Sequence, residues 1–223
     1  MSIIYLSKDA NPLLISYLNH MGHHCNSIAE SCHLPVAIAS HPDLYMCKLG
    51  SHPDAPVYFG ESDLPGMTYP NDIVYNAACT GKFFIHNFSF TEPGLRNAAF
   101  EMGAIPVDVK QGYTKCNLVV LDERHLITSD KGIHKALAVY SDVSCLLVEP
   151  GHVNLPGYKT GFIGGASGRV GGQVIFHGSL PKHPDFLRIK EFVESTGLIP
   201  VWFEEFPLTD IGSIIEAPET EVT

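Results

Sequence analysis

Cys116 has the residue type and the setting of a candidate nucleophile. It follows a glycine turn at Gly112, and Lys115 stands directly beside it. A thiolate is a strong nucleophile once its pKa falls, and a neighbouring cation lowers that pKa. We therefore expect Lys115 to activate Cys116, and Cys79 is the second candidate. The alternative for either cysteine is a small buried apolar residue, a common role of free cysteine.

A His-Pro-Asp tripeptide occurs three times, at 41–43, 52–54 and 183–185. The third copy stands where a helix is expected to begin, so its proline and aspartate are expected to serve in the first turn and as the cap. A similar turn role is the alternative for the other two copies. The functional interpretation of the first copy makes His41 a proton shuttle and Asp43 a carboxylate that binds a guanidinium or amine.

The sequence favours neither a metal nor a nucleotide cofactor. His20 and His24 stand four residues apart, as two zinc ligands on a helix would, but Gly22 is expected to end the helix between them. The glycine-dense stretch 161–172 lacks the dinucleotide-binding fingerprint and is followed by a strand-like run, QVIFHG. We expect a flexible or close-packed loop there, and no cofactor.

The elements that must position these residues repeat along the chain. Each copy predicts an apolar strand, an amphipathic helix and a second apolar strand, over 82–109, 125–148 and 173–203. Residues 2–28 give a fourth copy, whose helix begins near Pro12, and 33–62 give a unit with short apolar runs and no convincing helix. Five units in 223 residues, with no linker between them, predict a single α/β domain over 1–223.

Composition excludes some classes of partner. The formal charge of -10 is unsuited to a nucleic-acid backbone. No apolar run approaches the roughly 20 residues that span a membrane, and no secretory signal is visible. Six cysteines without an export signal are typical of reduced thiols in a cytoplasmic protein. The partners still open are a cationic small molecule and a second copy of the chain, as in a homodimer.

The polar segments just before the inner strands carry a resemblance to a known family. In the position of these segments within each repeated unit, the chain resembles the pentein, or guanidino-group-modifying, superfamily. It resembles most closely an uncharacterised bacterial group of that fold. The resemblance implies a pseudo-fivefold propeller of strand-helix-strand units around a central channel, and these segments would line the channel. They are 41–47, 76–81, 112–117, 168–172 and 209–213.

The resemblance also implies roles for residues in these segments. Enzymes of the superfamily attack the guanidinium carbon with a cysteine thiolate, a histidine moves protons, and carboxylates hold the cationic nitrogens. Here Cys116 and His41 would be catalytic. The substrate would be bound by Asp43, Cys79, Arg169, Asp210 and Asn117, the last of which is expected to begin a strand.

Two functions follow from this resemblance. The first is a cysteine-dependent hydrolase or transferase that acts on a guanidino- or amidine-bearing small molecule. The second is a catalytically silent pentein that binds a small molecule or a protein through the same channel. The family's catalytic cysteine lies in the final unit, whereas residues 209–213 contain none. The catalytic hypothesis requires Cys116 to lie within about 10 Å of His41 or Asp43.

Overall fold

The computed structural model describes residues 2–219. Its strands are β1 Ser2–Ser7, β2 His24–Ile28, β3 Met46–Lys48, β4 Val57–Phe59, β5 Ala78–Cys79, β6 Phe83–His86, β7 Ile105–Asp108, β8 Leu118–Val120, β9 His125–Thr128, β10 Ser144–Leu147, β11 Ser167–Val170, β12 Gln173–Phe176, β13 Ile199–Val201 and β14 Ile215–Pro218. They pair in five small sheets, ordered β14-β1-β2, β3-β4, β5-β6-β7, β8-β9-β10 and β11-β12-β13.

Four of these sheets share one connectivity. The middle strand (β1, β6, β9 or β12) is antiparallel to one neighbour and parallel to the other. A helix makes each parallel crossover, as parallel pairing requires. These helices are α1 Pro12–His20, α2 Pro93–Glu101, α4 Lys131–Leu137 and α5 Phe186–Ser195. The strand-helix-strand units predicted from the sequence are confirmed.

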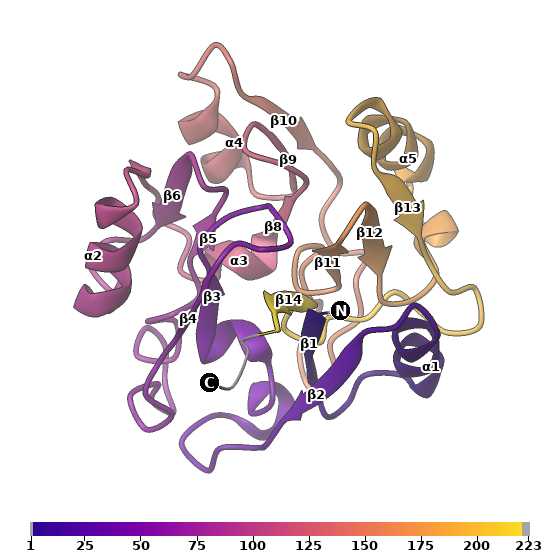
Figure 1. The fold of residues 1–223 in the computed structure, drawn as a ribbon, viewed down its shortest axis with the longest axis horizontal. Coiled ribbons are helices and arrows are strands. Elements are labelled where there is room, and N and C mark those ends of the chain that lie inside the picture. The colour runs from indigo at the N-terminus through magenta and orange to yellow at the C-terminus, as the bar shows by residue number, and fades with distance from the viewer. Residues whose placement is uncertain (1, 220–223) are drawn as a thin grey trace.

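The sheets are arranged around the middle of the molecule, and the four helices lie at its periphery (Figure 1). The strands nearest the middle are β14, β3, β5, β8 and β11. Strand β14 contacts β3 and β11, β3 also contacts β5, and β11 also contacts β8. The first sheet joins the two ends of the chain, because Ile3 of β1 pairs with Ala217 of β14.

Helix α1 shows how the local sequence sets an element. The Asn11 side chain accepts from the Leu13 N–H, and Pro12 occupies the first turn, where a missing N–H leaves no bond unmade. Leu14 and Leu18 are fully buried, and each such side chain contributes roughly 1.5–3 kcal/mol to folding. Gly22 follows with a φ of +86°, which ends the helix as predicted.

The core consists of several clusters between each helix and the sheets that flank it. Leu95 and Ala99 of α2 pack with Phe84, and Ile133 of α4 packs with Phe83. The sheets therefore converge on a middle that the helices do not reach. Buried polar side chains, among them Asp43, Asn76 and Ser213, lie on the segments just before these inner strands.

One local expectation is confirmed and two need correction. Residues 33–62 contain two short 3-10 turns and no α-helix, as predicted, and their only strands are β3 and β4. Asp185 occupies the cap position of α5, but its carboxylate accepts from the Glu149 N–H at 2.7 Å instead of capping the helix. Asn117 ends a short helix, α3 Thr114–Asn117, and the strand begins only at Leu118.

Across 2–219, no helix has both the length and the apolar character needed to cross a membrane.

Candidate functional site

The structure brings Cys116 and Asp43 into direct contact. Cys116 lies in α3, and Asp43 lies in a 3-10 turn over Pro42–Leu44. The Cys116 thiol donates to Asp43 Oδ2 at 3.1 Å. Both residues are buried. Two residues that are 73 positions apart in the sequence thus meet, within the distance that the catalytic hypothesis requires.

Asn76 fixes the orientation of this cysteine. Its Nδ2 donates to Cys116 Sγ at 3.2 Å and to the Asp43 carbonyl at 3.3 Å. Its Oδ1 accepts from the N–H groups of Lys115, at 2.9 Å, and Cys116, at 3.3 Å. A single buried amide therefore binds both the sulfur and the start of the short helix that carries it.

A chain of hydrogen bonds continues from Asp43 to a buried lysine. The Lys115 ammonium donates to Ser213 Oγ at 2.9 Å, and Ser213 Oγ donates to Asp43 Oδ2 at 2.7 Å. Lys115 also lies 3.5 Å from the Gly164 carbonyl oxygen. Asp43 Oδ2 thus accepts from both Ser213 and Cys116, while Asp43 Oδ1 is buried and has no partner among the described residues.

The charges of this cluster overturn one expectation. Burial raises the pKa of the Cys116 thiol well above its ordinary value, and the carboxylates of Asp43 and Asp210 raise it further. Lys115 stands beside Cys116 in sequence, but its ammonium donates to Ser213, and its positive charge does not outweigh burial and the two carboxylates. The resting sulfur is a protonated thiol, and the group placed to accept its proton is Asp43.

Cys116 lies in the wall of a cavity of about 130 Å³, which we call the cysteine cavity. His41 and Asp210, both predicted site residues, lie in the same wall. His41 Nδ1 is 3.9 Å from Asp210 Oδ1. The remaining wall is largely apolar and aromatic and includes Tyr113, Tyr158 and Phe162.

Asp210 is the acidic group of the cysteine cavity. Burial raises its pKa to about 6, although hydrogen bonds from the Gly212 and Phe162 N–H groups, both 2.9 Å long, favour the charged form. Burial also lowers the pKa of His41, against the opposing effect of Asp43. Near neutral pH the cavity therefore holds an ionised Asp210 beside a neutral imidazole.

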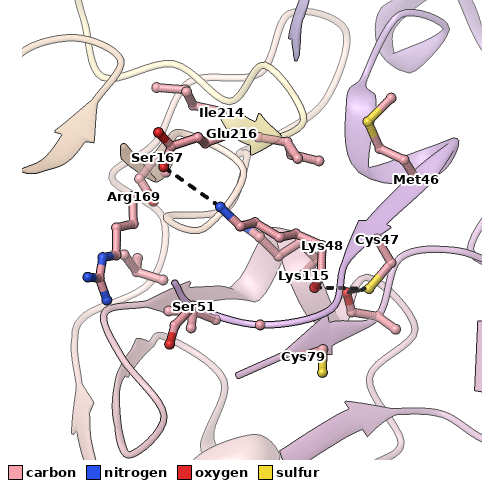
Figure 2. A pocket seen from close by; sticks show the side chains of 16 residues that line it. Met46, Cys47, Lys48, Ser51, Cys79, Lys115, Ser167, Arg169, Ile214 and Glu216 are labelled. Atoms are coloured by element: carbon pink, nitrogen blue, oxygen red, sulfur yellow. Dashed lines mark hydrogen bonds and ion pairs between the residues drawn. The ribbon is translucent and has the colours of Figure 1, made fainter. Parts of the chain in front are cut away.

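The other predicted site residues lie elsewhere. Cys79 and Arg169 line a second cavity of about 50 Å³, which we call the basic cavity (Figure 2). Asn117 lines neither cavity, because its Nδ2 donates to the Tyr113 carbonyl and closes the turn of α3. Asp43, predicted to bind substrate, lies behind Cys116 and contacts the sulfur. The residues that the sequence predicted to line a single channel are thus divided between two cavities on either side of α3.

Residues 161–166 form a close-packed loop, one of the two alternatives predicted for the stretch 161–172, and β11 then begins at Ser167. The Phe162 N–H binds Asp210, and the Gly165 N–H donates to the Cys116 carbonyl at 2.8 Å. Helix α1 ends at His20 and His24 begins β2, so the predicted end of the helix between these two histidines is confirmed. No group of three metal-ligating side chains occurs in residues 2–219.

Sequence reasoning did not single out several members of the cluster. Asn76 and Ser213 lie in two of the polar segments before inner strands. The recurrence of these segments in each unit could therefore have identified them. Ser213 has a φ of 75°, which is rare outside glycine and concentrates at functional sites. Phe162 lies in the glycine-dense stretch 161–172 and Tyr158 precedes it, but no sequence signal marked either residue as part of a site.

The comparisons with known proteins give one match. The model of DUF6873, described as a family of unknown function, matches residues 5–215. No curated protein and no solved structure matches the chain.

Proposed function

We propose, from the premise that the chain belongs to DUF6873, a family of unknown function, that it is a cysteine-dependent hydrolase or transferase. Its substrate would be a small molecule that bears an amidine or guanidino group. The observation that carries the proposal is the Cys116 thiol, held 3.1 Å from Asp43 Oδ2 in the wall of a cavity that also contains Asp210. The assignment rests on this site, since the family match names no reaction.

The cysteine cavity has the chemistry to hold a small planar cation. Asp210 supplies negative charge where solvent is largely excluded, which strengthens its attraction for a cation. Tyr113 and Phe162 stack with ring centroids 6.1 Å apart, and aromatic faces attract amidinium and guanidinium ions. A cavity of about 130 Å³ has room for a small group of this kind.

The groups present allow a balanced reaction for an amidinium. Cys116 gives its proton to Asp43, and the sulfur bonds to the amidinium carbon. Asp43 returns that proton to a nitrogen, which leaves as ammonia when its bond to carbon breaks. Neutral His41 then takes a proton from water as its oxygen bonds to the same carbon. Breaking of the carbon–sulfur bond releases the amide, the hydroxyl proton returns to sulfur, and His41 gives its proton to the ammonia.

The arrangement of the sheets supports, as part of the same proposal, a pentein-like propeller. Five small sheets, four with one connectivity, surround the cluster. The cluster residues Asp43, Asn76, Lys115, Cys116, Asp210 and Ser213 all come from segments that the resemblance assigns to the channel. All six cysteines are free, which suits a reducing cytoplasmic setting for thiol chemistry.

A second candidate function has its own observation. The raised pKa of Cys116 is that of a buried thiol, and a protonated sulfur is a weak nucleophile. On this ground a silent member that only binds a cation in the cysteine cavity is the alternative. Ammonia release separates the two functions, because binding alone produces none.

Two alkylating probes that differ only in charge test the site. Chloroacetamidine carries an amidinium, and chloroacetamide is its neutral counterpart. We expect the amidinium probe to label Cys116 at least about tenfold faster, after correction for the rates of the two probes with free glutathione, because Asp210 concentrates the cation beside the sulfur. Intact mass and peptide mapping measure the rates.

Two variants control the labelling. Cys116→Ser should remove the fast phase, and Cys32→Ser should remove only background labelling, since Cys32 is exposed. Equal corrected rates for the two probes at Cys116 would sink the cation site. Incubation with acetamidine then decides between the functions: steady ammonia release that Cys116→Ser abolishes supports the hydrolase, and binding without release supports the silent alternative.

Cation binding in the cysteine cavity should depend on pH. Asp210, with a pKa of about 6, is ionised above that pH and neutral below it. Acetamidinium affinity, measured by calorimetry, should therefore rise by up to about tenfold per unit as the pH increases toward 6, and level off above it. Protonation of His41 at low pH acts in the same direction. Neutral acetamide should show no such rise, and a flat profile for acetamidinium would contradict the role of Asp210.

A further inference from the structure

The basic cavity lies on the other side of α3 from the cysteine cavity. Lys115 lines the basic cavity and Cys116 lines the cysteine cavity, so adjacent residues face different spaces. Lys48 and Arg169 also line the basic cavity, and Glu216 is its only carboxylate among residues 2–219. Three cations against one acid form a local positive excess in a chain whose formal charge is -10.

Glu216 offsets only one of these three positive charges, and its two oxygens also accept hydrogen bonds from neutral donors. Oε1 accepts from Ser2 Oγ at 2.9 Å, and Oε2 accepts from the Gly171 N–H at 3.0 Å. The Lys48 ammonium lies 3.7 Å from Oε2, beyond hydrogen-bond distance. Figure 2 shows the Lys48 side chain extended toward Glu216, with Arg169 on the neighbouring strand.

Lys48 and Arg169 keep donors to spare. Lys48 Nζ donates to the Pro53 carbonyl at 3.3 Å, which uses one of its three hydrogens. Arg169 donates through Nε to Gly171 O at 3.1 Å and through Nη1 to Leu121 O at 2.6 Å. Its Nη2 donates to no residue that the structure describes. These two carbonyl contacts hold the guanidinium in place at the cavity.

Other charged groups near the cavity are engaged or turned to solvent. Asp122, beside Arg169, accepts from the Arg124 and His125 N–H groups and from the His125 ring. Asp54, beside Lys48, is exposed. Burial and the like charge of Arg169 lower the pKa of Lys48 to about 8, which Glu216 and Asp54 oppose. Two cations thus face one space and repel each other.

We propose that the basic cavity is a second binding site, for a small oxyanion such as phosphate or a carboxylate group. One oxygen would accept from Lys48 Nζ and another from Arg169 Nη2. The cavity volume of about 50 Å³ exceeds the roughly 10–15 Å³ that a single water needs by the same kind of measure, so it has room for a small ion. This proposal is independent of the reaction at Cys116.

Calorimetric titration with inorganic phosphate tests the site, with chloride added to hold ionic strength constant. We expect saturable one-to-one binding, weakened at least about tenfold by Arg169→Met and by Lys48→Met. Acetate titrated in parallel distinguishes the two sources: tighter phosphate binding indicates a tetrahedral anion, and tighter acetate binding indicates a carboxylate.

The controls address folding and location. Lys190→Met removes an exposed cation on α5 and should leave phosphate affinity unchanged. Arg169→Lys keeps the charge and loses the fork, so an intermediate affinity is expected even if a methionine variant fails to fold. Amide NMR shifts should be largest at Gly168 and Lys48. No saturable binding, shifts elsewhere, or equal affinity in wild type and Arg169→Lys would overturn the proposal.

Discussion

Replacing Lys115 with methionine is expected to lower the free energy of unfolding by about 3 kcal/mol at neutral pH. The ammonium is buried, and Ser213 links it to the buried carboxylate of Asp43. Removing the lysine leaves the Asp43 charge uncompensated, and that loss outweighs the gain from burying an apolar side chain. Urea unfolding, followed by circular dichroism, measures the change.

A double-mutant cycle shows whether the loss comes from the charge pair. Asp43→Asn is nearly isosteric and leaves Lys115 as the unbalanced charge, so it should also destabilise the protein. The double variant should lose much less than the sum of the two single losses, since it buries neither charge. Lys190→Met, on the surface, should cost little. Strict additivity, or a Lys115→Met loss as small as that of Lys190→Met, would contradict the coupling.

The local part of the fold could be predicted from the sequence because its causes are local. Pro12 and Gly22 bound α1, and the apolar spacing of Leu14 and Leu18 sets its buried face. The repeated pattern gave four strand-helix-strand units. The role of Asp185 could not be predicted in this way, because its hydrogen bond goes to Glu149, 36 residues away.

The site was harder to predict, because its members meet only through the tertiary fold. The recurring polar segments before the inner strands correctly grouped Cys116, Asp43, His41 and Asp210 as neighbours. The same pattern also grouped Cys79 and Arg169 with them, because a position in the sequence does not show which of the two cavities beside α3 a side chain lines. The expectation that Lys115 activates Cys116 was wrong for a related reason: adjacency in the sequence does not show that burial and the carboxylates of Asp43 and Asp210 raise the pKa of the thiol more than one cation lowers it.

A large effect of a single added carbon is expected at Gly165. A Cβ there would lie 2.1 Å from Asp210 Oδ1 and 2.5 Å from its Cγ. Asp210 cannot yield easily, because the Phe162 and Gly212 N–H groups hold its two oxygens. Gly165→Ala should therefore cost about 3 kcal/mol in unfolding free energy, at the upper end for overpacking, and displace the carboxylate of the cysteine cavity.

Gly172→Ala is the matched control in the same glycine-rich stretch. A Cβ at Gly172 meets nothing within 4 Å, and its backbone is outside the left-handed region. This variant should unfold within about 1 kcal/mol of wild type. If Gly165→Ala still folds, Asp210 is the group it displaces, so the preference of Cys116 for chloroacetamidine should fall while chloroacetamide labelling persists. An unchanged preference would mean that Asp210 does not attract the cation, even if the predicted destabilisation is observed.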